Sequence, residues 1–205
     1  MRQARDDRIA LFCAKTWGLQ LTQVPGLGDC LPFVVALFLI LSYGVKGVTH
    51  MSLRRDVAEF TSYLIAVLEN PSVDITPRNH VFAKFKGHMF IETFAEEIKA
   101  NVNDFPQGLK AILDVLKWYA HKNKESKFDL GSEALAIFAA VYDIAFNVKV
   151  FNNGVFIYEY TVGGSFGTPG VATLIYHIDR KHYDFLSRNA AAAQTALQQM
   201  VRMSV

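Results

Sequence analysis

The sequence predicts an α+β fold, in which helices form the first part of the chain and a small, mainly antiparallel sheet follows. Residues 6–146 carry mostly helical spacing of apolar side chains. Segments rich in valine and aromatic residues begin at Asn147, and Asn152-Asn153-Gly154 between the first two is a strong hairpin signal. Helices and strands that occupy separate parts of a chain favour an α+β arrangement over a doubly wound α/β sheet.

Helical patterns recur in several segments before the strands, and one more ends the chain. The expected helices cover residues 6–17, 31–43, 53–70, 82–120 (interrupted at 103–108), 133–146 and 189–203. Ser52 and Ser132 precede two of them and are the predicted N-caps. Residues 31–43 are the most apolar segment, but they are fewer than the about 20 needed to cross a bilayer. We therefore expect a buried core helix there and no stable membrane insertion.

Short strands are expected in the last part of the chain, at residues 147–151, 155–162, 171–178 and 182–186. Along a strand, side chains two residues apart point to the same face of the sheet. His182 and Asp184 both belong to the last of these strands, so the imidazole and the carboxylate can meet side by side.

The composition is that of one globular domain. The chain has 205 residues, enough for one good-sized core, so we expect a single domain over residues 1–205 and a monomer. The net charge of +2 is too small to indicate nucleic acid as the main partner. Cys13 and Cys30 make no disulfide framework, and no spacing of cysteine and histidine predicts a metal site. A cytosolic location is the simpler expectation; secretion into a host cell without a cleavable signal peptide stays open.

Cys30 is the first candidate functional residue. It follows the glycine-rich turn PGLGD at residues 25–29 and precedes the apolar segment 31–43. At the first turn of a helix, unpaired N–H groups and the helix dipole favour a thiolate over a thiol. The glycines let the backbone bend tightly, so that successive N–H groups can point at a developing oxyanion. Taken alone, however, a cysteine before an apolar helix is more often a small buried hydrophobe.

His182 and Asp184 supply the other parts of a cysteine hydrolase, namely an imidazole base and a carboxylate that orients it. Taken alone, His182 is equally compatible with a residue of a surface turn. His177, on the preceding predicted strand, is a weaker candidate, which we interpret as a half-buried histidine. The combination of Cys30, His182 and Asp184 is therefore the hypothesis for an active site.

Several segments resemble the ovarian-tumour (OTU) family of cysteine proteases, most of which are deubiquitinases. PGLGDCL at residues 25–31 resembles the family's nucleophile motif, and LRRDV at residues 53–57 resembles the start of its next helix. LGSEALAIFA at residues 130–139 resembles its central helix, and HYDFL at residues 182–186 resembles its closing motif. The resemblance implies a papain-type cysteine protease fold, with a small sheet flanked by helices.

The resemblance also implies the roles of individual residues. Cys30 would be the nucleophile, His182 the general base and Asp184 the residue that orients it, while Gly28 and Asp29 would belong to the oxyanion loop. The bond that is hydrolysed would join the C-terminal glycine of ubiquitin to a lysine amine, through a thioester on Cys30. Ubiquitin or polyubiquitin chains are therefore the expected partners, and no cofactor is expected.

Some features depart from the compact members of the family and keep other interpretations open. Leu27 and Asp29 replace an aspartate and an asparagine of the family's loop, and Asp29 adds a negative charge beside the thiol that opposes thiolate formation. Residues 71–127 look like the helical insertion of OTU enzymes from intracellular bacterial pathogens, which favours an effector. The alternatives are a ubiquitin-binding module without catalysis, a protease for another ubiquitin-like modifier or a polyprotein, and a helical interaction protein with an inert Cys30.

Overall fold

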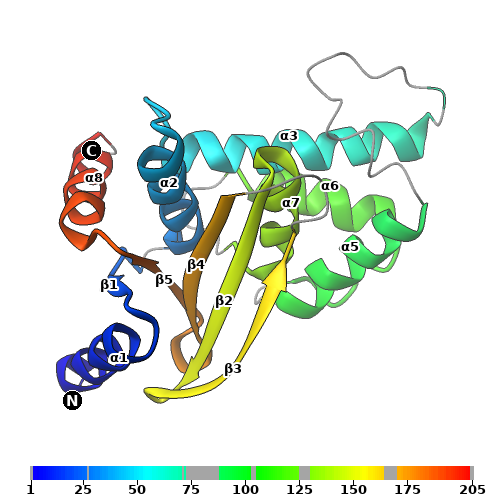
Figure 1. Ribbon diagram of the computed structural model, residues 1–205. Coiled ribbons are helices and arrows are strands. Elements are labelled where there is room, and N and C mark those ends of the chain that lie inside the picture. Colours follow the sequence, from blue (N-terminus) through cyan, green and yellow to red (C-terminus); the bar gives the residue numbers. More distant parts are fainter. Residues whose placement is uncertain are drawn as a thin grey trace.

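The computed structural model describes residues 2–26, 28–70, 72, 88–102, 105–124, 130–163 and 170–203. Its helices are α1 (Arg2–Trp17), α2 (Cys30–Tyr43), α3 (His50–Glu69), α5 (His88–Asn101), α6 (Ile112–Lys122), α7 (Ser132–Tyr142) and α8 (Ala190–Arg202). Its strands are β1 (Gln20–Thr22), β2 (Ile144–Asn152), β3 (Val155–Val162), β4 (Gly170–His177) and β5 (His182–Ser187), and the short 3-10 helix η2 (Ile178–Arg180) joins β4 to β5. Figure 1 shows α2 and α7 behind the sheet, with α5 and α6 to its right and α1 and α8 to its left.

The sheet has the strand order β1-β5-β4-β2-β3. All neighbours pair antiparallel except β2 and β4, which run parallel. The hairpin explains the exception: β3 returns the chain to the start of β2, so β4 begins at that end on the other side of β2. The predicted α+β class with a mainly antiparallel sheet is confirmed. Strand β1 was not expected, because its three residues are too few to show an alternating pattern.

One helix ends earlier than the sequence suggests. The helix predicted over residues 133–146 ends at Tyr142, and β2 begins at Ile144. Between them, Asp143 adopts the left-handed conformation with φ 52°, which ends the helix. The residues on both sides of this point are mostly buried and apolar. Such runs fit a buried helix and a buried strand equally well, so the pattern could not locate the change.

Both predicted N-caps are helical residues instead. In α3 the N-cap is Thr49, whose hydroxyl accepts a hydrogen bond from the backbone N–H of Ser52 at 3.1 Å. The Ser52 hydroxyl in turn accepts one from the N–H of Thr49 at 3.0 Å, which completes a capping box. In α7 the N-cap is Gly131, and Ser132 is the first helical residue.

The predicted helical insertion, residues 71–127, contains α5 and α6. Residues 71, 73–87, 103–104 and 125–127 of this range lie outside the described part of the chain. The ring of Phe94 in α5 lies edge-on to Phe60 of α3 and to Tyr119 of α6, with ring centroids 6.3 and 5.8 Å apart. These contacts join α5 and α6 to the same hydrophobic cluster as α2 and α7. That this segment is an insertion stays a prediction.

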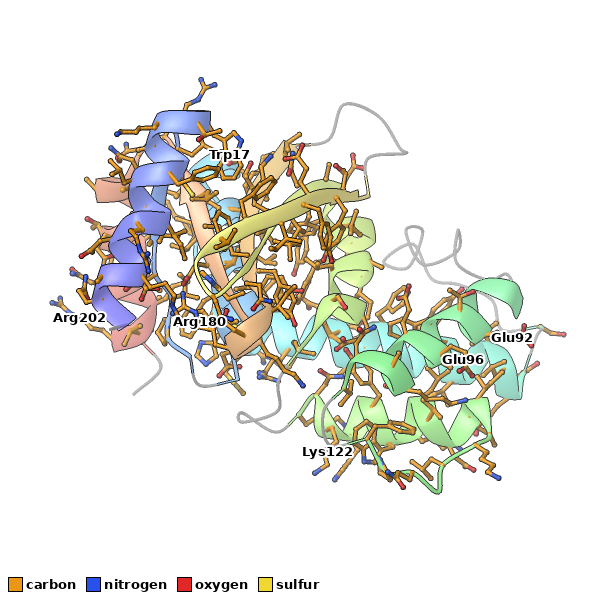
Figure 2. The ribbon with its side chains drawn as sticks, turned by 90° about the horizontal axis from the view of Figure 1, so that it is seen from below. Trp17, Glu92, Glu96, Lys122, Arg180 and Arg202 are labelled. Atoms are coloured by element: carbon orange, nitrogen blue, oxygen red, sulfur yellow. The ribbon has the colours of Figure 1, made fainter. Side chains whose placement is uncertain are left out.

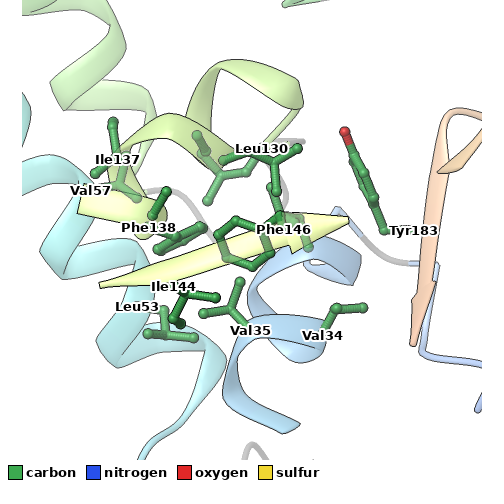
Figure 3. Packing of buried hydrophobic residues seen from close by; sticks show 14 of the residues in the cluster. Val34, Val35, Leu53, Val57, Leu130, Ile137, Phe138, Ile144, Phe146 and Tyr183 are labelled. Atoms are coloured by element: carbon green, nitrogen blue, oxygen red, sulfur yellow. The ribbon is translucent and has the colours of Figure 1, made fainter. Parts of the chain in front are cut away.

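Helix α2 lies at the centre of the main core. All its residues from Cys30 to Leu39 are buried, as expected for the apolar segment. Figure 3 shows core side chains from α2, α3, α7 and β2 packed together, including Val34, Val35, Leu53, Val57, Ile137, Phe138, Ile144 and Phe146. Burying one such side chain stabilises the fold by about 1.5–3 kcal/mol. Among the described residues, no helix is both long and apolar enough to cross a membrane.

Helix α1 packs on the opposite face of the sheet. Ile9 and Cys13 of α1 form a second, smaller cluster with Phe151, Ile175 and Leu186. These three strand residues alternate with neighbours that face the main core, as the period of two in a strand requires. The cluster holds α1 against the sheet near η2, which leads directly into β5.

Candidate active site

Cys30 is the first residue of α2, where the sequence predicts it. Gly28, two residues earlier, has φ 86°, a conformation that glycine adopts without strain. The Asp29 carbonyl accepts the first helical hydrogen bond from the N–H of Phe33 at 3.0 Å. The thiol, only 5% exposed, therefore lies at the positive end of the dipole of a well-formed helix. Leu27, the other departure from the family's loop, lies outside the described residues.

His182 begins β5 and lies between Cys30 and Asp184. Its Nε2 is 3.0 Å from Oδ1 of Asp184, and its ring lines the same pocket as Cys30, whose side chain raises the pKa of the imidazole. Because Nε2 is engaged by the Asp184 carboxylate, the other ring nitrogen, Nδ1, is the one available to the thiol. Burial lowers the pKa of His182, but the hydrogen bonds and charges of Asp184 and Cys30 outweigh burial and raise this pKa to about 9. The structure thus brings together the three side chains of the predicted site.

Asp184 is almost fully buried, with 1% exposure, and both of its oxygens have partners. The N–H of Val24 donates to Oδ1 at 3.0 Å, and His177 Nε2 lies 2.9 Å from Oδ2. Arg180 Nη2 lies 3.4 Å from the same Oδ2. Burial raises the pKa of Asp184, but the hydrogen bonds to His177 and His182 outweigh it and hold this pKa well below its usual range. The carboxylate is therefore ionised at neutral pH.

His177 contacts the same carboxylate from the neighbouring strand. It is 1% exposed, so the half-buried histidine inferred from the sequence is in fact fully buried. Burial lowers its pKa despite the hydrogen bond to Asp184, so the ring is neutral at pH 7. Sequence reasoning assigned it no role at the site. The available signal was the tight connection between β4 and β5, which places His177 directly opposite His182 in the sheet.

Asp29 does not leave an unpaired negative charge beside the thiol. Nε of Arg54, in α3, contacts Asp29 Oδ1, and Arg54 Nη2 donates to the carbonyl of Gly28 at 2.7 Å. Arg54 is 1% exposed, so this ion pair is little screened by solvent. His50 Nε2 lies 3.8 Å from Asp29 Oδ2. Arg54 thus neutralises Asp29 and ties the proposed oxyanion loop to α3, a role the sequence did not reveal.

A pocket of about 380 Å³ opens beside the thiol and the imidazole. It is lined by Gly26, Gly28, Cys30, Ile178, Asp179, Arg180, Lys181 and His182. Figure 2 labels Arg180, the last residue of η2, which forms an ion pair with Asp6 of α1. One wall therefore comes from the loop before the cysteine and the other from the connection before the histidine. A substrate carbonyl in this pocket could be attacked by the sulfur, and His182 could return a proton to the leaving group.

The comparisons with known proteins identify the fold. No protein-family model matches the sequence, and no curated protein matches it. Among solved structures, the OTU domain of OTUD1 aligns with a TM-score of 0.51 at 11% identity, over 90% of this chain and 95% of that chain. An OTU deubiquitinase from Wolbachia pipientis wMel aligns with a TM-score of 0.51 at 16% identity, over 88% of this chain and 95% of that chain.

A structure of an OTU deubiquitinase from the same source bound to ubiquitin aligns with a TM-score of 0.51 at 16% identity, over 83% of this chain and 97% of that chain. The chain therefore has the OTU fold, as the sequence predicts.

Proposed function

We propose that the protein is a deubiquitinase that uses Cys30 as the nucleophile against the C-terminal glycine carbonyl of ubiquitin. The observation that carries the proposal is that Cys30 and His182 line the same pocket while His182 Nε2 lies 3.0 Å from Asp184 Oδ1. The OTU fold is a second support, because one structure with this fold is a deubiquitinase bound to ubiquitin. The pairing of Asp29 with Arg54 removes the main electrostatic objection to a thiolate at Cys30.

The reaction would begin from the thiolate of Cys30 and the imidazolium of His182. The sulfur attacks the carbonyl carbon, and backbone N–H groups of Gly28 to Cys30 hold the oxyanion. His182 gives its proton to the lysine amine as the C–N bond breaks, which leaves a thioester on Cys30. His182 then takes a proton from the attacking water, and the thioester breaks to release the ubiquitin carboxylate and the thiolate. Asp184 keeps the His182 ring in the orientation that both proton transfers need.

The proposal is tested with ubiquitin that carries a thiol-reactive group at its C-terminus. We expect an adduct that is lost in Cys30→Ala and retained in Cys13→Ala, because Cys13 is fully buried in the other cluster. Parallel reactions with other ubiquitin-like modifiers establish which modifier is preferred. Ubiquitin binding without an adduct would favour the ubiquitin-binding module without catalysis. If the protein neither bound nor reacted with any modifier, the helical interaction protein with an inert Cys30 would be the remaining interpretation.

A further inference from the structure

The second oxygen of Asp184 faces a layer of charged and polar groups behind the proposed site. Oδ1 accepts a hydrogen bond from the N–H of Val24 and faces His182, whereas Oδ2 lies near His177 and Arg180. Arg180 Nη2 is also 2.9 Å from His177 Nε2, so Asp184, Arg180 and His177 form a closed group. The torsion that turns a carboxylate about its Cβ–Cγ bond is broad and two-fold. Groups that fix Oδ2 therefore also fix the direction of Oδ1.

Arg180 is in turn held from α1. Its Nη2 lies 3.1 Å from Oδ1 of Asp6, and its Nη1 lies 3.5 Å from Oδ2 of Asp6. The side chain of Asp6 is 5% exposed and that of Arg180 is 15% exposed, so solvent screens this ion pair little. A second ion pair joins the adjacent residues, with Arg5 Nη1 2.5 Å from Oδ2 of Asp179. Helix α1 therefore holds η2 through two neighbouring ion pairs of opposite polarity.

This arrangement bears on the reactivity of the thiol. Asp179 and Arg180 line the pocket beside Cys30, and η2 leads into His182. Buried ion networks add little net stability, since desolvation offsets the attraction, but they can hold one geometry against others. The network from α1 to Asp184 is continuous: Asp6 contacts Arg180, Arg180 contacts His177, and His177 contacts Asp184. Displacing α1 would remove Asp6 from Arg180, and the Arg180 side chain could then move away from Oδ2 of Asp184.

We propose that Asp6, Arg180 and His177 are positioning residues: Asp6 of α1 anchors Arg180, which together with His177 orients Asp184 toward His182. Helix α1 thereby controls how readily Cys30 reacts, although none of the residues described as lining the pocket belongs to it. For substrate turnover the inference rests on the proposed deubiquitinase activity. For the intrinsic reactivity of the thiol it rests only on the network itself.

The test compares Asp6→Asn with Asp7→Asn. Asp7 is the matched control, because it is an exposed carboxylate on the same helix whose side chain accepts a hydrogen bond only from Gln3 among the interactions described for it. The measurements are the rate of Cys30 alkylation by iodoacetamide from pH 5 to 9, with the modified cysteine identified by mass spectrometry, and kcat and KM on a fluorogenic ubiquitin substrate. Asp6→Asn should slow alkylation at pH 7 and lower kcat by roughly 2- to 30-fold, the range expected for coupling through a packed network.

Further variants separate positioning from general loss of structure. Arg180→Lys should retain more activity than Arg180→Met, because a cation near Oδ2 is kept, and the midpoint pH of alkylation should move upward in Arg180→Met. Circular dichroism and the melting temperature identify any variant that fails to fold. Alkylation and turnover in Asp6→Asn and Arg180→Met equal to those of Asp7→Asn would overturn the inference while leaving the function intact. A wild-type protein inactive on ubiquitin would instead remove the proposed function, and the alkylation profiles would still decide the inference.

Discussion

Replacing Arg54 by methionine removes the cation that neutralises Asp29 next to the proposed nucleophile. Methionine keeps a long, unbranched side chain in the buried site of α3, so the change is mainly one of charge and hydrogen bonding. The loss leaves the Asp29 carboxylate, whose residue is 6% exposed, with His50 as its nearest described basic neighbour at 3.8 Å. Burial is the main influence on His50 and lowers its pKa in the native protein; the Arg54 charge lowers this pKa further, so Arg54→Met allows His50 to offset part of the lost charge while burial still opposes its protonation.

The magnitude follows from the burial of both partners. Removing one member of a buried ion pair typically destabilises a protein by about 3–5 kcal/mol, because the other charge stays buried without compensation. For a chain of this length, a loss of that size lowers the melting temperature by roughly 6–20 °C. The control is Arg55→Met, because Arg55 is exposed on the same helix. A surface change of this kind is expected to stay within about 0.5 kcal/mol.

The double variant Arg54→Met/Asp29→Asn makes the prediction sharp. It removes both charges, so most of the lost unfolding free energy should return even though the ion pair is absent. The assays are urea denaturation at pH 7 and the rate of Cys30 alkylation, which should fall in the single variant because an unpaired Asp29 disfavours the thiolate. The reasoning is refuted if Arg54→Met is as stable as Arg55→Met, or if the double variant is no more stable than the single one.

The remaining predictions concern the histidines, pH and the core. His182→Ala should abolish turnover, whereas Asp184→Ala should weaken it less, because Asp184 orients the ring and transfers no proton; an inactivating His177→Ala with an active His182→Ala would reverse the assignment of the base. The raised pKa of His182, about 9 against 6.5, contributes on the order of 3 kcal/mol of stability that is present below pH 6.5 and lost as pH rises through about 9. The depressed pKa of Asp184 contributes stability that is present above its ordinary value of 3.8 and lost as pH falls through its lower folded value. Urea denaturation across this range should therefore show the stabilising effect of the pair at its largest between about pH 4 and 6.5, and a His182→Gln variant that tracked the wild type at every pH would contradict this. Phe138→Ala should cost about 3–5 kcal/mol in the same assay because Phe138 is fully buried, whereas Ile157→Ala, at 51% exposure, should cost far less.

Local chemistry explains which features the sequence could predict. The β2–β3 hairpin was predictable because Asn153 and Gly154 take positive φ values of 49° and 84°, which the paired strands require of a two-residue turn. The placement of Cys30 was predictable because a glycine turn before an apolar run marks a helix start. His182 and Asp184 were predictable as a pair because they are two residues apart on one strand.

Features that depend on tertiary placement could not be predicted in this way. Arg54 lies on a different helix from Asp29, and Asp6 lies almost the whole chain away from Arg180, so no local pattern links either pair. The resemblance to OTU proteases did include the Leu-Arg pair at the start of α3, but it gave Arg54 no partner. The parallel pairing of β2 and β4 likewise depends on the side of β2 on which β4 pairs after β3 ends, and strand propensity does not specify that side.

The electrostatic difference between His177 and His182 explains how one carboxylate can serve two histidines in different ways. Their Nε2 atoms lie 2.9 and 3.0 Å from the two oxygens of Asp184, so distance to the carboxylate does not distinguish them. Burial is the largest influence on both rings and lowers both pKa values; it prevails at His177, where the Arg180 guanidinium 2.9 Å from Nε2 lowers the pKa further. At His182 the Cys30 side chain adds to the effect of Asp184, and together they outweigh burial. A cation disfavours an imidazolium and a thiolate favours it, so these neighbours add to the balance between burial and Asp184, and the pKa values of the two rings move in opposite directions. Arg180 therefore has two effects at once: it contacts Asp184, and it adds to the lowering of the His177 pKa that burial causes, which leaves His182 as the histidine that carries the proton.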